Sequence, residues 1–78
     1  MKLKEILTYC KTALKAPYHV FYMSKDMCCI RLEQEYSKDY WVTSGESFYK
    51  AAMNMYDYIQ HEIKQGTIKE PKIKKSNK

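Results

Sequence analysis

The chain has 78 residues, of which 45% are hydrophobic and 14% aromatic, and its net charge is +5. This length allows one domain with a modest core, which argues against a deep catalytic pocket, and the hydrophobic content argues against disorder over most of the chain. The positive charge lies mainly at the two ends, because residues 17–63 contain four basic and seven acidic side chains. A nucleic-acid-binding face built into the folded elements would usually concentrate basic residues there.

The sequence predicts a cytoplasmic protein. No run approaches the roughly 20 apolar residues that cross a bilayer as a helix. The N-terminus MKLKEILTYCK has Glu5 and Lys11 where a signal peptide needs an uninterrupted apolar region. We therefore expect no membrane among its partners.

The first predicted element is an amphipathic helix over residues 2–15, which Pro17 prevents from continuing. Its hydrophobic stripe consists of Leu3, Ile6, Leu7, Cys10 and Leu14. Lys4, Lys11 and Lys15 lie along one flank of this helix, near Thr8. Such a row is most often a solvated edge, and otherwise it contacts phosphate or an acidic partner.

Two strands are predicted next, over residues 18–23 and 27–36, because YHVFYM is rich in aromatic and β-branched residues and MCCIRLEQEY alternates in polarity. A two-residue turn at Lys25-Asp26 would place three cross-strand pairs on the side that meets the helices: Met23 with Cys28, Phe21 with Ile30, and His19 with Leu32. The opposite, open side would carry Tyr18, Val20, Tyr22, Cys29, Arg31 and Glu33. Because Lys-Asp lacks the Gly that such turns favour, a register shifted by one residue, which exchanges the two faces, is the alternative.

A short third strand is predicted over residues 40–43, after a turn at Ser37-Lys38. This turn would point Trp41 toward the core near Gln34 and would place Tyr40 and Val42 on the open side, with Glu33 and Glu35.

The last predicted element is a long amphipathic helix over residues 47–65, with Ser47 as its N-cap and Gly66 as its C-cap. Its hydrophobic stripe consists of Phe48, Ala52, Met55, Ile59 and Ile63. The predicted fold is therefore α+β, a two-layer sandwich in α-β-β-β-α order, with a three-stranded antiparallel meander and both helices on one face.

We expect one domain over residues 1–66, followed by a flexible Lys-rich C-terminal tail over residues 67–78. The tail sequence TIKEPKIKKSNK has too little apolar surface to offset the entropy cost of ordering it.

No catalytic or metal-binding pattern stands out in the sequence. Cys10, Cys28 and Cys29 are an odd number without CxxC spacing, and neither His19 nor His61 has an acid-base partner at a typical spacing. We therefore expect a protein that is not an enzyme and needs no cofactor or metal, with Cys10 and Cys28 as small core residues.

The fragments EILTYC, APYHVFYM and SGESFYKAA, in this order, resemble a double-stranded-RNA-binding domain over residues 3–65. The resemblance implies one helix, three strands and a second helix. It also implies contact with the RNA backbone through a lysine cluster that opens the last helix, where this sequence has Lys50 alone. The segment TSGESFYKAAMNMYDYI also resembles the strand-turn-helix of HicB-type antitoxins.

Our main hypothesis is a small non-enzymatic protein that binds and modulates another protein. The candidate contact residues are Tyr49, Met53 and Tyr56, as an exposed row on the long helix, and Tyr22, Glu33, Glu35 and Tyr40 on an acidic, tyrosine-bearing sheet face. An acidic face suits a nucleic-acid-handling host protein with a basic groove. Short chains of this composition are typical of phage or mobile-element genes, whose products include anti-CRISPR and other anti-defence inhibitors. Either surface could also form a homodimer.

The alternative hypothesis is a nucleic-acid-binding module. Its candidate residues are the lysines of the first helix, Lys4, Lys11 and Lys15, and those of the tail, Lys72, Lys74 and Lys75.

Overall fold

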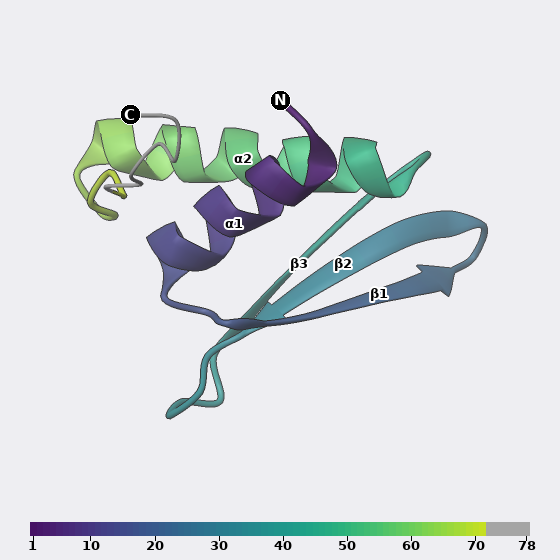
Figure 1. Cartoon of the computed structure of the whole chain (residues 1–78), viewed down its shortest axis with the longest axis horizontal. Helices are drawn as coiled ribbons and strands as arrows, with labels where there is room; N and C mark the ends of the chain where they lie inside the picture. The colour runs from purple at the N-terminus through teal and green to yellow at the C-terminus, as the bar shows by residue number, and fades with distance from the viewer. Residues whose placement is uncertain (72–78) are drawn as a thin grey trace.

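The computed structural model describes residues 1–71 and contains two helices and three strands (Figure 1). In chain order these are α1 (Leu3–Leu14), β1 (Tyr18–Ser24), β2 (Met27–Glu33), β3 (Tyr40–Gly45) and α2 (Phe48–Gln65). The strands form one antiparallel sheet in the order β1-β2-β3. The predicted α+β fold in α-β-β-β-α order is therefore confirmed.

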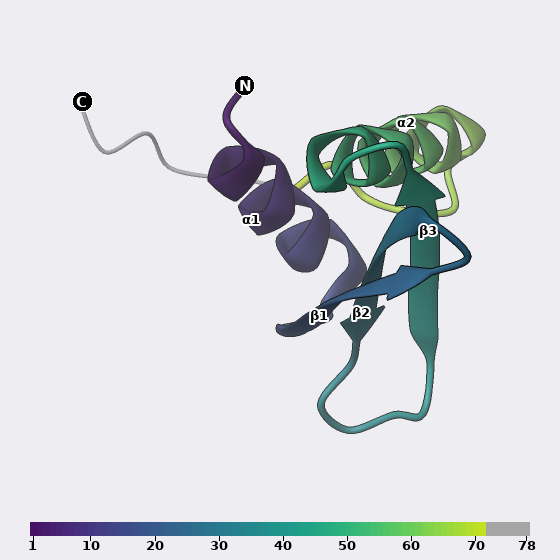
Figure 2. The same ribbon diagram turned by 90° about the vertical axis from the view of Figure 1, so that its right-hand side faces the viewer.

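The helices form a layer on one side of the sheet (Figure 2). Helix α2 packs on β3 and β2, and α1 packs beside α2. The extensive contacts of β1 are with β2, so β1 extends beyond the part of the sheet that α2 covers. All seven residues of β1 are exposed.

The first hairpin has the predicted register. Phe21 pairs with Ile30 and Tyr22 with Cys29. The turn residues Lys25 and Asp26 have φ values of 50° and 66°, the left-handed conformation that both central residues of a type I′ turn require. The tight turn thus forms without glycine, and the alternative register is excluded.

The predicted turn between β2 and β3 is wrong by two residues in register. Trp41 pairs with Leu32 instead of lying near Gln34, and β2 ends at Glu33 instead of Tyr36. The side chain of Gln34 leaves the sheet and donates a hydrogen bond from Nε2 to the carbonyl of Leu14, at 2.9 Å. Residues 34–39 form a longer loop, closed by a bond from the backbone nitrogen of Gln34 to the carbonyl of Asp39 at 3.3 Å. A shift of two residues leaves each side chain on its predicted face.

Two hydrogen bonds join helix α2 to the end of β3. Thr43 Oγ1 donates to the carbonyl of Ala51 at 2.7 Å, and Asn54 Nδ2 donates to the carbonyl of Ser44 at 2.7 Å. Gly45 follows these two strand residues, and an added Cβ there would approach the backbone nitrogen of Ala51 to 2.8 Å. Only glycine allows this close approach.

The predicted caps of α2 are confirmed. Ser47 Oγ accepts a hydrogen bond from the backbone nitrogen of Lys50 at 3.1 Å, and Gly66 ends the helix with φ at 82°. Ile68, which the sequence assigned to the tail, is half-buried against the core. The tail candidates Lys72, Lys74 and Lys75 lie outside the described residues.

The core lies between the helices and the two covered strands. Its buried residues are Ile6, Leu7, Cys10, Leu14, Ala16, Ile30, Leu32, Ala51, Ala52, Met55 and Ile59. Cys10 is a core residue as predicted, but Cys28 is only half-buried. Cys29, its neighbour, is buried on the opposite face of the sheet, because it lies on the central strand between Tyr22 and Ser44.

We expect Gly45→Ala to lower the free energy of unfolding by about 1–3 kcal/mol, because the new methyl group would collide with the backbone of α2. Urea denaturation checks this value. Ser44→Ala, at the exposed neighbouring position, should change stability by less than about 0.5 kcal/mol. Equal effects of the two substitutions would contradict the close approach.

Burial raises the pKa of the Cys10 thiol from 9.0 to about 12. The thiol of the unfolded chain therefore ionises first as the pH rises, and the stability from this group is complete below about pH 9 and is lost toward about pH 12. By about pH 10.5 we expect the wild type to have lost roughly 2 kcal/mol more than Cys10→Ala. Urea denaturation of both proteins at neutral and alkaline pH checks this, and parallel losses would contradict it.

Candidate functional site

The largest group of exposed hydrophobic side chains on the strands lies on the face of the sheet opposite the helices. We call it the open face and define it by six residues, which are between 38% and 53% exposed: Tyr18, Val20, Tyr22, Met27, Tyr40 and Val42. Cross-strand pairing brings them together, because residues on both edge strands lie opposite the same residues of β2. Soluble domains rarely leave a contiguous apolar patch of this kind uncovered without a binding role.

The charged residues of the open face neutralise each other. Arg31 Nε lies 2.7 Å from Glu33 Oε2, and the Arg31 guanidinium lies 4.0 Å above the ring of Tyr40. These two residues are the only Asp, Glu, Lys or Arg on the three strands. The strands therefore present a neutral, aromatic face. The acidic face expected from the sequence is absent from the strands, because Glu33 pairs with Arg31 and Glu35 lies in the loop after β2.

The structure brings together three of the four residues predicted for the sheet surface. Tyr22, Glu33 and Tyr40 lie on the open face, whereas Glu35 lies in the exposed loop between β2 and β3. Met27 belongs to the open face although the sequence did not mark it as a contact residue. The sequence contained a signal for this residue, because strand alternation places Met27, beside the turn, on the same side as Cys29 and Arg31.

The opposite face of β1 is exposed as well, which the sequence did not predict. Phe21 is 42% exposed and Met23 is 60% exposed, although their alternation places them on the side of the helices. The reason is that α2 covers β2 and β3 and stops short of β1. Phe21 reaches α2 only at its first residue, with the rings of Phe21 and Phe48 5.1 Å apart.

The predicted row on α2 is mostly an interhelical contact. Tyr56 is half-buried with its ring 5.1 Å from that of Tyr9, and Met53 is half-buried against the core. Tyr49 is exposed, and its hydroxyl donates to the carbonyl of Met1 at 2.7 Å. The prediction of an exposed row is wrong for Met53 and Tyr56, because α1 lies along that side of α2.

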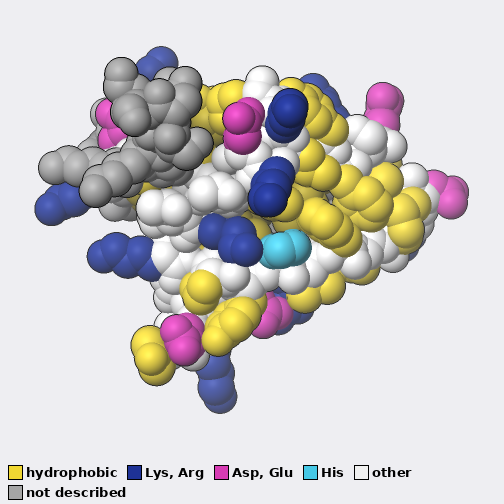
Figure 3. Space-filling model, viewed as in Figure 1, with side chains coloured by type: hydrophobic (Ala, Val, Ile, Leu, Met, Phe, Trp, Pro, Cys, Tyr) yellow, Lys and Arg dark blue, Asp and Glu magenta, His cyan; other side chains and the backbone are white. Residues whose placement is uncertain are grey.

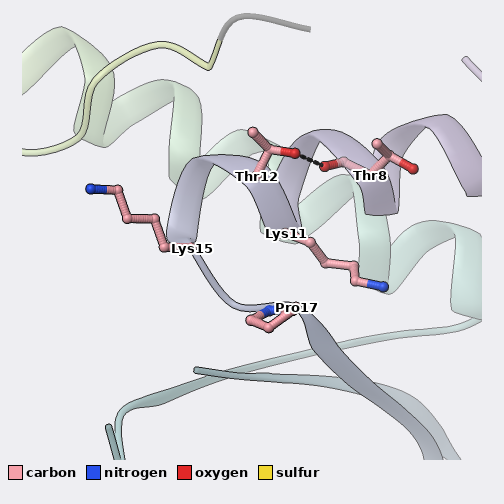
Figure 4. A pocket seen from close by; sticks show the side chains of 5 residues that line it. All are labelled: Thr8, Lys11, Thr12, Lys15 and Pro17. Carbon is pink, nitrogen blue, oxygen red and sulfur yellow. Dashed lines mark hydrogen bonds between the residues drawn. The ribbon is translucent and has the colours of Figure 1, made fainter. Parts of the chain in front are cut away.

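A groove runs between α1 and β1, on the face seen in Figure 3, where a hydrophobic area borders basic side chains and a histidine. The groove consists of two adjoining hollows that share Thr8 and Lys11. Figure 4 shows one of them beneath the last turn of α1, where Lys11 and Lys15 extend in opposite directions above Pro17. The predicted lysine row of α1, Lys4, Lys11 and Lys15, therefore lines this groove.

Residues 1–71 show no set of three or more His, Cys, Asp or Glu side chains close enough to bind a metal ion. Over the same residues, neither helix has the length and hydropathy to cross a membrane. His19 lies at the groove, where its Nδ1 is 3.0 Å from Lys11 Nζ. His61 is exposed on α2.

Comparisons of the chain with protein-family models, with curated proteins and with solved structures gave no significant match.

Tyr56→Ala should lower the free energy of unfolding by about 1–3 kcal/mol, because it removes a half-buried ring that packs on Tyr9. Thermal and urea denaturation measure the loss. Tyr58→Ala, on the exposed side of the same helix, is the matched control and should cost less than about 0.5 kcal/mol. If both variants melt like the wild type, Tyr56 does not contribute to the interhelical contact.

Proposed function

We propose that this chain is a non-enzymatic protein-binding module that contacts its partner through the open face of the sheet. The observation that carries the proposal is the uncovered set of six apolar side chains on that face. Tyrosine and methionine are enriched at protein interfaces, and aromatic side chains near the centre of an interface contribute most to affinity.

The chemistry of the open face favours an apolar protein surface as the partner. Its single cation, Arg31, already pairs with Glu33 and stacks on Tyr40. A nucleic acid would need unpaired Lys or Arg side chains along its phosphates, in addition to aromatic rings on which bases stack. A protein surface requires only an apolar centre with polar groups around it, which the Arg31–Glu33 pair can satisfy.

The more specific hypothesis is that the partner is a nucleic-acid-handling host protein and that the chain is a phage or mobile-element inhibitor with an anti-CRISPR or other anti-defence role. The net charge at the open face gives this hypothesis no support, because the face is neutral where a basic groove would favour acidic groups. It stays a prediction.

The test removes one aromatic ring from each of the two edge strands of the open face. Tyr22→Thr combined with Tyr40→Thr keeps strand-forming residues at both positions. The matched control removes two exposed rings elsewhere, Tyr36→Thr with Tyr58→Ala. All three proteins are used to capture partners from a nuclease-treated lysate of the source organism, and quantitative mass spectrometry compares the captured proteins.

We expect a protein that the wild type and the control capture equally and that the open-face variant loses. With that protein purified, calorimetry should show binding that is weaker by about thirtyfold or more, which corresponds to about 2 kcal/mol for a central aromatic anchor. Capture that is unchanged in the open-face variant would contradict the proposal. So would a wild type that forms a dimer in sedimentation through these tyrosines and captures nothing else.

A further inference from the structure

A second surface lies on the other side of β1, distinct from the open face. β1 is at the edge of the sheet, so the outer row of its backbone N–H and C=O groups has no strand partner in residues 1–71. The other edge strand is partly closed, because the carbonyl of Ser44 in β3 accepts the bond from Asn54 of α2. A free edge of this kind can pair with an extended segment of another chain.

The groove between α1 and β1 lies next to this edge. One of its two hollows, of about 460 Å³, has an apolar floor of Leu3, Leu7 and Phe21. The adjoining hollow, of about 500 Å³, lies under the last turn of α1 and is lined by Lys11, Lys15, Pro17 and two threonines. Phe21 is partly supported from below by Phe48 and from the side by His19, whose ring lies 5.2 Å from that of Phe21. The floor therefore consists of side chains that pack on one another, and Phe21 keeps an exposed surface above β1.

The charge of the groove has one sign. Lys4, Lys11 and Lys15 line it, and no Asp or Glu does. Within residues 1–71 the ion pair of the protein is Arg31–Glu33, on the other face of the sheet, so no carboxylate there neutralises these lysines. Lys11 Nζ lies 3.0 Å from His19 Nδ1.

The dimensions of the groove fit an extended segment. From Lys4 to the end of α1 at Leu14, next to Lys15, the helix spans about 15 Å at a rise of 1.5 Å per residue. A strand covers this length with about five residues at 3.3 Å each, and alternate side chains point to the same face. A strand added beside β1 would therefore present two or three side chains toward the lysine flank of α1.

We propose that this groove binds an extended acidic peptide segment of a partner protein, which adds as a fourth strand to the free edge of β1. Its backbone bonds to β1, and the alternate side chains that face the groove are Asp or Glu, which bind Lys4, Lys11 and Lys15 above the apolar floor. A nucleic acid uses the same lysines but has no use for the free strand edge or for the floor of Leu3 and Leu7, and for this reason the peptide is the favoured occupant.

The probe is a short capped peptide of alternating Glu and Val, titrated into ¹⁵N-labelled full-length protein up to about 1 mM and followed by NMR. We expect amide shifts to concentrate in residues 18–24 and on the groove side of α1. A second peptide of the same sequence, N-methylated at alternate residues so that it cannot pair with a strand, should cause none of these shifts. Tyr40→Thr with Val42→Thr, which changes the open face on β3 alone, should bind the first peptide normally, which separates this site from the open face.

Matched charge variants complete the test. Lys4→Gln with Lys11→Gln should weaken peptide binding by about threefold to tenfold, whereas Lys50→Gln with Lys64→Gln, which removes the same charge from α2, should leave it unchanged. The proposal is overturned by no binding at the highest concentration, by equal binding of the N-methylated peptide, or by equal effects of the two charge variants. It is also overturned if an oligonucleotide duplex at physiological salt shifts the same amides at lower concentration than the peptide.

Discussion

The close contact between the end of β3 and the first turns of α2 determines the arrangement of the other elements. Gly45 lets the two backbones approach, and the bonds from Thr43 and Asn54 fix the helix over β3 and β2. One apolar side of α2 is then left uncovered by the sheet, and α1 packs against it. Two helices in this position are too few to cover three strands, and β1 is left outside the layer. Both surfaces of β1 that we connect with binding follow from this one junction.

Much of the fold depends on local signals, and these could be predicted from the sequence. Hydrophobic periodicity marked both helices, and Ser47 and Gly66 marked the ends of the second. The two-residue spacing between the first strands was enough to set their register, even though Lys25 and Asp26 are unusual in the left-handed conformation. The open face followed from the same register, so most of its residues could be identified before the structure was known.

The errors come from contacts between elements that are distant in sequence. The strand β2 ends at Glu33, and the next residue, Gln34, bonds through its side chain to the carbonyl of Leu14, a contact that no local pattern shows. Tyr56 was expected to be exposed because its angle on α2 is off the main stripe, but the position of α1 decides what covers it. Phe21 has the alternation of a core residue, yet it is 42% exposed because α2 stops short of β1. A periodicity identifies the face of an element and gives no information on how far its neighbour extends.

The attachment of β1 also bears on the dynamics of the domain. Its extensive contacts are with β2, and none of its residues belongs to the buried core. If β1 separated from the sheet, the helices and the remaining strands would keep that core, because its residues lie in α1, α2 and β2, apart from Ala16, two residues after α1. We therefore expect local unfolding of this strand to be a step separate from global unfolding. Any molecule that binds β1 draws on this local equilibrium, so that its affinity includes the free energy of keeping one strand in place.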